Sequence, residues 1–174
     1  EKSGSPYDNE TDNYKQTHYQ LFYNQNLSTH LKLNVALFTT TGKGYFEQYK
    51  AGQSFSRYNL PNFINGNDTI TDVNLVRQLW LDNIYYGSIF SIHYNKNKTS
   101  IISGGNISIY NGNHFGKIIY SEILNAIPDN FKWYDLDAVK SEVSFFGKWT
   151  EQINSKWQTY VDLQARNIDY TING

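Results

Sequence analysis

Cysteine is absent from the 174 residues of this chain, and so is methionine. The first absence excludes a disulfide framework, a thiolate nucleophile and a metal site built on cysteine. The second means that the sequence does not begin at an initiation codon. We therefore expect a mature or excised piece of a longer protein, from which any targeting signal has been lost.

An excess of charge of one sign is also missing. The 15 basic residues nearly balance the 16 acidic ones, and the formal net charge is −1. This balance argues against a nucleic-acid partner, because proteins that bind nucleic acid usually carry a strong basic excess. No apolar run approaches the roughly 18 residues that a transmembrane helix needs.

Aromatic residues are abundant, by contrast. They make up 17% of the chain and include 15 tyrosines, although the mean hydropathy is only −0.61. The length is enough for one ordinary domain with a sizeable core. A chain this aromatic is not disordered, and its combination of aromatic and polar residues is unusual for a soluble globule.

The dominant sequence period is two. Apolar and polar residues alternate in six segments, and alternation of this kind predicts strands that have one apolar and one mostly polar face. The residues that we place on the apolar faces are Tyr19, Leu21 and Tyr23; Leu31, Leu33, Val35 and Leu37; Tyr86, Phe90, Ile92 and Tyr94; Ile101, Ile107 and Ile109; Val143, Phe145 and Trp149; and Trp157, Val161, Leu163 and Ala165.

The connections between these segments alternate between short and long. Short polar turns at 24–29, 95–98 and 154–155 predict hairpins that pair 17–24 with 30–40, 84–95 with 99–110, and 142–153 with 156–169. The other two connections, 41–83 and 111–140, are long loops in this interpretation. An up-and-down order of strands then places all three short turns at one end of the sheet and both long loops at the other.

Two stretches inside the long connections have patterns of their own. Asp72–Leu81 fits a short helix, with Asp72 as its N-cap and Leu75, Leu79 and Trp80 on one face. Asp135–Val139 is either a helical turn or the start of the fifth strand. The polar N-terminal stretch Glu1–Asn13 is expected to be irregular.

Two folds are compatible with the alternation. One is a soluble antiparallel β-sandwich, in which the apolar face packs on a second layer. The other is part of a transmembrane β-barrel, whose strands are apolar outward and polar inward and whose short and long connections lie at opposite ends. We favour the barrel, because the predicted outward faces contain no charged residue except Glu151, and because aromatic residues lie beside the short turns: Tyr23, Tyr94, Trp149 and Trp157.

Six strands cannot close such a barrel, since the smallest bacterial barrels have about eight. An open edge in lipid would leave backbone donors and acceptors unpaired. The prediction is therefore an all-β fold of antiparallel up-and-down hairpins in which residues 1–174 form a fragment of a larger barrel domain. Its inward-facing side chains would line a polar lumen: Asn34, Asn106, Lys148, Asp162, Gln164 and Arg166.

Several stretches of the chain resemble the barrel region of TonB-dependent outer-membrane receptors of the Bacteroidetes type. They are Ser5–Tyr14, Thr17–Leu21, Gly42–Lys50, Leu75–Asn83 and Gly112–Gly116. The resemblance implies a 22-stranded barrel in the bacterial cell outer membrane, in contact with outer-membrane lipid. It also implies import of a scarce small-molecule or metal-chelate ligand of the siderophore–iron, cobalamin or glycan class.

The sequence departs from that family by omission. It has no plug domain, no TonB-interacting box and no C-terminal strand that ends in Phe. Contact with the TonB system, and transport itself, would therefore belong to a parent protein in which the plug is present. This chain would supply part of the barrel wall and two outer loops.

No pattern in the sequence indicates catalysis, a metal or a cofactor. The four histidines are far apart and lack metal-ligand spacing. Asp135, Asp137 and Glu142 are better explained as decoration of a loop rim than as an acid–base pair. Gly42–Gly44 lacks phosphate-loop spacing, and a nucleophile elbow is missing. We therefore expect a non-enzymatic protein with no resident cofactor and no metal site.

The long connections hold the candidate ligand-binding residues, since exposed aromatic rings beside basic groups can stack on or pair with a ligand. The alternative is that these rings pack the connections onto one another. A third use of exposed rings, in the soluble sandwich, would be binding of carbohydrate or protein. The candidates are Tyr45, Tyr49, Arg57 and Tyr58 in the first connection, and His114, Trp133 and Tyr134 in the second.

Overall fold

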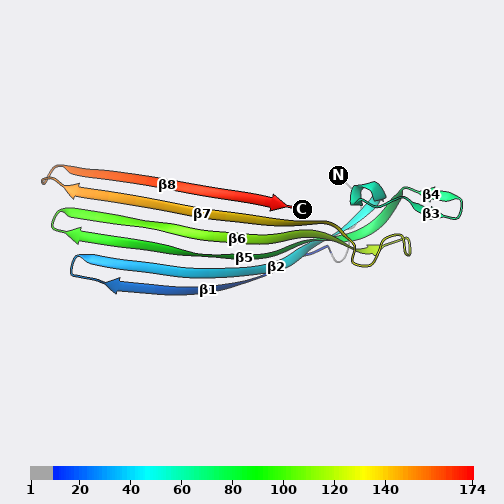
Figure 1. The fold of residues 1–174 in the computed structure, drawn as a ribbon, viewed down its shortest axis with the longest axis horizontal. Helices are drawn as coiled ribbons and strands as arrows, with labels where there is room; N and C mark the ends of the chain where they lie inside the picture. The colour runs from blue at the N-terminus through cyan, green and yellow to red at the C-terminus, as the bar shows by residue number, and fades with distance from the viewer. Residues whose placement is uncertain (1–9) are drawn as a thin grey trace.

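The computed structural model describes residues 10–174 and is almost entirely β-structure (Figure 1). Residues 1–9, which include Ser5–Asn9 of the first stretch compared above, lie outside the described part. Six long strands form one antiparallel sheet in the order β1-β2-β5-β6-β7-β8. Their bounds are β1 (Asp12–Asn26), β2 (Leu31–Ser54), β5 (Asp72–Lys96), β6 (Thr99–Ser121), β7 (Lys132–Gln152) and β8 (Gln158–Asn173).

The predicted all-β class and the up-and-down order of antiparallel hairpins are confirmed. The three predicted pairings form as β1 with β2, β5 with β6, and β7 with β8. The sheet is open rather than closed, with β1 and β8 as its two edges. None of the helical structure in residues 10–174 has the length and hydropathy of a membrane-spanning helix.

The long connections were predicted incorrectly at 41–83 and 111–140. Most of these residues continue the strands, because β2 runs to Ser54 and β5 begins at Asp72. The actual connections are 55–71 and 122–131. The first contains a short 3₁₀ helix, η1 (Phe55–Tyr58), and a small hairpin of β3 (Phe63–Asn65) with β4 (Asp68–Ile70).

The helix predicted over Asp72–Leu81 is also wrong, because this stretch belongs to β5 and pairs on both sides with β2 and β6. Ladder hydrogen bonds on both sides outweigh a weak local helical pattern. Asp135–Val139 is the start of the fifth long strand rather than a helical turn. Asp12 and Asn13, predicted irregular, are already part of β1.

The short turns have the residue types that tight turns favour. Asn97 and Lys98 alone join β5 to β6, and Asn97 takes a φ of 53°, a left-handed conformation that asparagine tolerates. In the turn from β7 to β8, the Asn154 Oδ1 accepts hydrogen bonds from the backbone N–H groups of Lys156 and Trp157, at 2.9 and 3.1 Å. Trp157 lies in this turn, one residue before the strand to which the sequence assigned it.

Strand register places the two predicted sets of side chains on opposite faces of the sheet. Leu33 lies opposite Ile92, Val35 opposite Phe90, and Trp149 opposite Val161 on one face, whereas Asn34 and Lys148 lie on the other. Directly opposed residues share a face because side chains alternate along each strand. The two predicted sets of side chains are therefore confirmed to lie on opposite faces, although the second face also carries apolar residues, among them Phe22, Ile89 and Ile102.

We call the apolar part of the first face the apolar band. It extends from the row of Leu31, Tyr94 and Trp149 to the row that contains Thr41 and Ile84. At about 3.3 Å per residue, this is about 33 Å along a strand. Glu151 and Lys96 lie one row below the band, Lys43, Asp82 and Asp137 lie one row above it, and Asp169 lies near its upper end on the edge strand β8.

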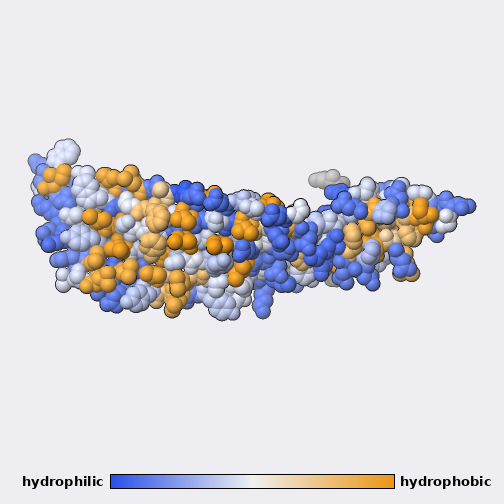
Figure 2. Space-filling view, viewed as in Figure 1, coloured by the Kyte–Doolittle hydropathy of each residue, from blue (hydrophilic) through white to orange (hydrophobic). Residues whose placement is uncertain are grey.

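The apolar band has no second layer over it within residues 10–174. Its side chains are widely exposed, as Leu163 at 71% and Phe145 at 51% illustrate. In the view of Figure 2, hydrophobic side chains gather over the half of the sheet next to the short turns. A zone of hydrophilic side chains separates them from a second apolar region at the far end. A sandwich would need a second sheet on this face, and the described residues do not form one.

The opposite face carries polar groups and ion pairs between its apolar side chains. Lys148 and Asp162 lie directly across from each other, with 3.5 Å between Nζ and Oδ2. Arg166 Nη2 lies 2.7 Å from Glu142 Oε2, also between β7 and β8. Asn34 donates a hydrogen bond to Ser91 Oγ at 3.3 Å across β2 and β5. Such a surface is stable only where water reaches it.

A small core closes the end of the sheet away from the short turns. We call this end, formed by residues 55–71 and 122–131 on the strand ends, the cap (Figure 1). Its buried side chains are Phe55, Tyr58, Val73, Leu75, Ile118 and Ile127. The two connections that the sequence suggested as open loops are therefore held by a shared core.

Substitution of Leu75 tests how much this core contributes to stability. Its side chain has no exposed surface, so Leu75→Ala should lower the free energy of unfolding of the cap by about 2–5 kcal/mol, through lost apolar burial and the cavity left behind. Leu124, which is 83% exposed in the same cap, is the matched control, and Leu124→Ala should change stability by less than about 0.5 kcal/mol. Denaturant unfolding in detergent micelles measures both, and equal effects would contradict the packing described here.

The open edges and the exposed apolar band predict how the isolated chain behaves. Unpaired backbone groups on β1 and β8 can pair with other chains, and the apolar band has no cover of its own. In water without detergent, the 174-residue chain should therefore sediment as oligomers or aggregates in analytical ultracentrifugation. A monomer that melts cooperatively would instead favour the soluble β-sandwich.

Candidate functional site

Three aromatic rings lie side by side on neighbouring strands, on the same face as the apolar band but nearer the cap. Tyr45 on β2 packs against Trp80 on β5, with ring centroids 4.7 Å apart. Trp80 stacks on Phe115 of β6 at 5.7 Å, with the ring planes only 5° apart. We call these three residues the aromatic row. Cross-strand aromatic pairs of this kind stabilise a sheet and hold each ring in place.

Two lysines flank the aromatic row. The Lys132 Nζ lies 4.3 Å from the centroid of Phe115, and the Lys117 Nζ lies 5.5 Å from it. The Lys117 Nζ is also 5.7 Å from the ring of Trp80. Both ammonium groups are therefore held near ring faces by cation–π attraction. Among residues 10–174, Lys117 forms no ion pair.

Lys132 also pairs with Asp135, with 2.6 Å between Nζ and Oδ2. The Asn113 side-chain amide donates hydrogen bonds to the carboxylates of both Asp135 and Asp137, at 2.8 and 2.9 Å. The Lys132 hydrogen bond, followed by that of Asn113, holds the pKa of Asp135 below its usual range. Asp135 is therefore satisfied by Lys132 and Asn113 together, and Asp137 accepts a hydrogen bond from the same amide.

A second cluster lies on the opposite face, where the strands enter the cap. Arg77 donates hydrogen bonds to Gln48 Oε1, at 3.0 Å from Nη2 and 3.3 Å from Nε. Its guanidinium carbon lies 5.8 Å from the ring centroid of Trp133, and its Nη1 donates to the hydroxyl of Tyr58 at 3.4 Å. Trp133 contacts both Tyr58 and Tyr134 edge to face, at 5.2 Å in each case. Burial raises the pKa of Tyr134, and nearby Arg77 opposes that effect.

The structure separates the predicted site residues into four environments. Tyr45 belongs to the aromatic row, whereas Tyr58, Trp133 and Tyr134 meet around Arg77 on the other face. Tyr58 has no exposed surface, so its ring packs the cap core. Arg57, in η1, and Tyr49, on β2, are exposed.

His114 is the remaining predicted residue. It lies on β6 on the polar face, and its Nε2 is 3.3 Å from the hydroxyl of Tyr110, four residues earlier on the same strand. Because alternate residues share a face, Tyr110 and His114 are neighbours on that face, apart from the aromatic row. The predicted residues therefore do not form one site.

Sequence reasoning did not select Trp80, Arg77 or Lys132 as site residues. Trp80 and Arg77 lie in the stretch that was interpreted as a helix, and the helical period hid their alternation. The signal that was missed is that the period of two continues through this stretch. Leu75, Arg77 and Leu79 lie on one face, and Val76, Gln78 and Trp80 lie on the other, which is also the face of Ile84.

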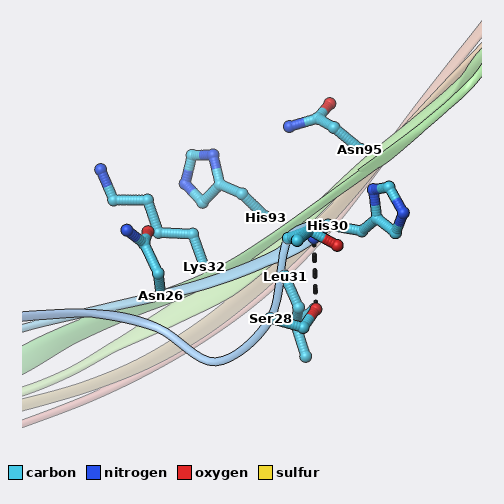
Figure 3. Close-up of a pocket in the computed structure, with 8 residues that line it drawn as sticks. Asn26, Ser28, His30, Leu31, Lys32, His93 and Asn95 are labelled. Atoms are coloured by element: carbon cyan, nitrogen blue, oxygen red, sulfur yellow. Dashed lines mark hydrogen bonds between the residues drawn. The ribbon is translucent and has the colours of Figure 1, made fainter.

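A hollow of about 480 Å³ lies at the opposite end of the sheet, beside the turn from β1 to β2 (Figure 3). It is lined mainly by hydrogen-bond donors, including Lys32 and His93, which lie directly across from each other. The Ser28 Oγ accepts a hydrogen bond from the backbone N–H of His30 at 3.2 Å, which shapes the turn. The hollow is open, and its side chains could contact a small anion from solvent.

The site as a whole offers binding chemistry. Within residues 10–174, no group of three or more His, Cys, Asp or Glu side chains could hold a metal ion. The aromatic row and its lysines can contact sugar rings and anions. No family model, curated protein or solved structure matches this chain.

The pKa of Asp135 tests the charge arrangement beside the aromatic row. Lys132→Gln should raise this pKa toward the usual aspartate range, because the largest cause of its lowering is removed. The lowered pKa stabilises the fold above the pKa of the unfolded chain, and this contribution is lost as the pH falls through the folded-state pKa. The variant should therefore lack this contribution at neutral pH, and its stability should fall less than that of the parent as the pH is lowered through the carboxylate range.

Carboxyl-carbon NMR titration in detergent micelles measures the pKa directly. Lys15→Gln, which removes the same charge from the edge strand β1, is the control and should leave the Asp135 titration unchanged. An unchanged titration in Lys132→Gln would show that the ion pair is absent in solution.

Proposed function

We propose that this chain is part of the barrel wall and outer connections of a TonB-dependent outer-membrane receptor. The observation that carries the proposal is a single-layered antiparallel sheet with an exposed apolar band on one face and ion pairs on the other. A lipid-facing wall around a polar lumen needs this division of side chains. The resemblance of Gly42–Lys50 and similar stretches to that family supports the choice of receptor.

The dimensions of the apolar band support a membrane-spanning role. In an outer-membrane barrel, strands tilt by about 35–45° and the apolar band is about 25 Å tall. When a strand is tilted by that amount, a length of about 33 Å along it corresponds to a height of about 25 Å across the membrane. The strands are much longer than this, with 25 residues in β5, so the wall would continue beyond the membrane toward the cap.

Aromatic side chains lie at both limits of the apolar band. Tyr94 and Trp149 occupy the row next to the short turns, and Tyr86 lies near the opposite limit. Tyrosine and tryptophan favour the membrane interface because the ring enters the apolar layer while the polar atom reaches water. This distribution supports an interface at each limit.

The orientation follows from the connections. Barrels of this kind have short turns on the periplasmic side and longer connections outside. The cap would then lie on the outer side, with Arg57 and Tyr49 exposed and Trp133 and Tyr134 beside the lumen face. We propose these four residues, in or beside the cap, as ligand contacts during import of a scarce small molecule or metal chelate. Energy would come from the TonB system through the plug of the parent receptor.

Single-cysteine scanning tests the proposal, because none of the 174 residues is a cysteine and each introduced thiol is unique within this part of the protein. In membranes of cells that express the complete gene, cysteines at Val35, Ile92 and Phe145 should react with a lipid-soluble reagent. The matched neighbours Asn34, Ser91 and Gln164 face the other side and should react with an aqueous reagent instead. Equal labelling of the two sets, or aqueous labelling of both, would rule out a lipid-facing band.

A further inference from the structure

The hollow beside the turn from β1 to β2 brings basic and amide side chains together. Asn26, Lys32 and His93 lie in one row across β1, β2 and β5, so they share the polar face. His30 and Asn95 lie on the short-turn side of that row, where the Asn95 backbone N–H donates to the His30 carbonyl at 2.8 Å. All five residues line the hollow, and Figure 3 shows Asn26, Lys32 and His93 on the same side of the strands.

We propose that this hollow binds a tetrahedral oxyanion of the sulfate and phosphate type, more tightly when His93 and His30 are protonated. The inference goes beyond the proposed function, because it assigns a second site at the end of the sheet opposite the cap. It does not depend on a membrane around the apolar band, since the hollow lies on the other face. In the orientation proposed above, the site would open toward the periplasm.

No carboxylate compensates the basic groups of the hollow. Its lining contains no Asp or Glu, and within residues 10–174 its lysine and two histidines form no ion pair. Beyond His93, the same row continues with the apolar Ile102, then Lys148 and Asp162. Asp162 is three strands from His93, or about 14 Å, and already pairs with Lys148. The counter-charge for the hollow must therefore come from an anion outside the described residues.

A chain of hydrogen bonds sets the form of the neutral His93 ring. The Asn34 side-chain amide donates to Ser91 Oγ at 3.3 Å, and Ser91 Oγ lies 3.0 Å from His93 Nε2. Because Ser91 Oγ accepts from Asn34, its own hydrogen is available to donate to Nε2, which leaves the ring N–H on Nδ1. That N–H meets no acceptor among the described residues, so it can donate to an anion in the hollow.

Protonation of His93 strengthens the site without moving a heavy atom. Nε2 then becomes a donor, and Ser91 Oγ can accept from it, because a hydroxyl oxygen has two acceptor positions and its hydrogen rotates. The added charge lies directly across from Lys32, and such a pair of like charges is unfavourable unless an anion compensates it. Histidine is the side chain that gains charge between about pH 8 and pH 5. Anion affinity should therefore rise as the pH falls.

The positions of the donors favour a tetrahedral anion. Asn26, Lys32 and His93 come from three neighbouring strands, and Asn95 and His30 add donors from the short-turn side. A sulfate or phosphate group presents oxygens in several directions and can accept from donors on each side. A carboxylate presents only two oxygens in one plane, so it would leave part of this set unpaired.

NMR of the histidine rings, with the full chain in non-ionic detergent micelles, tests the inference. The probe is inorganic sulfate at constant ionic strength, because its charge does not change over the pH range used. Sulfate should shift the signals of His30 and His93 saturably and leave those of His18 and His114, further along the same face, unchanged. Its affinity should be at least about fivefold higher at about pH 5.5 than at about pH 8. Acetate should bind at least about tenfold more weakly than sulfate.

Variants assign the effect to the hollow. Lys32→Gln should weaken sulfate binding by at least about tenfold, because it removes the permanent positive charge. His93→Gln keeps a side-chain donor but cannot gain charge, so it should lose most of the increase at low pH, with the His30 signal as the readout. Lys140→Gln removes the same charge from the same face nearer the cap, and this control should bind sulfate as the parent does.

Unchanged signals of His18 and His114 show that each variant is folded. Equal binding of acetate and sulfate, a sulfate affinity that does not change with pH, or an equal loss in Lys140→Gln would each overturn the inference. Cysteine labelling of the apolar band reports on the proposed function separately. Lipid labelling of the band without sulfate binding would overturn only the site in the hollow.

Discussion

Every feature of this molecule depends on the continuous antiparallel ladder of backbone hydrogen bonds. The ladder pairs strands of more than 20 residues over nearly their whole length, with register shifts only near the cap. Because side chains alternate along each strand, one register decides the face of every residue at once. A shift of one residue on β5 would move Phe90 and Ile92 to the polar face and Ser91 and His93 to the apolar one.

A sheet of one layer cannot bury its own faces, so its stability depends on what covers them. The described residues bury a compact core only in the cap, around Phe55, Tyr58 and Leu75. Elsewhere the polar face is satisfied by water and cross-strand pairs, whereas the apolar band must meet lipid or other chains. The proposed membrane location supplies that cover, and the hydrophilic zone between the band and the cap marks its outer limit (Figure 2).

The core of the cap gives several aromatic residues of the connections a structural role rather than the ligand-binding role expected from the sequence. Tyr58 was expected to meet a ligand but fills the core, and Trp133 links that core to Arg77. The outer connections are therefore packed against a preformed scaffold. Such a scaffold fixes the backbone from which exposed groups such as Arg57 project, which lowers the entropy cost of the proposed ligand binding. The aromatic row provides a separate surface on the other face of the same strands.

The sequence by itself determined the strand hairpins, the tight turn at Asn97 and the face of residues such as Val35 and Lys148, because period-two alternation and turn propensities are local. It could not determine that β5 begins at Asp72. The helical pattern of Leu75, Leu79 and Trp80 competes locally with strand alternation, and only pairing with β2 and β6 decides between them. The tertiary structure alone brought Trp80 beside Tyr45 and Phe115, and Lys117 beside Lys132. These residues are far apart in sequence, and cross-strand register, which no local pattern records, makes them neighbours.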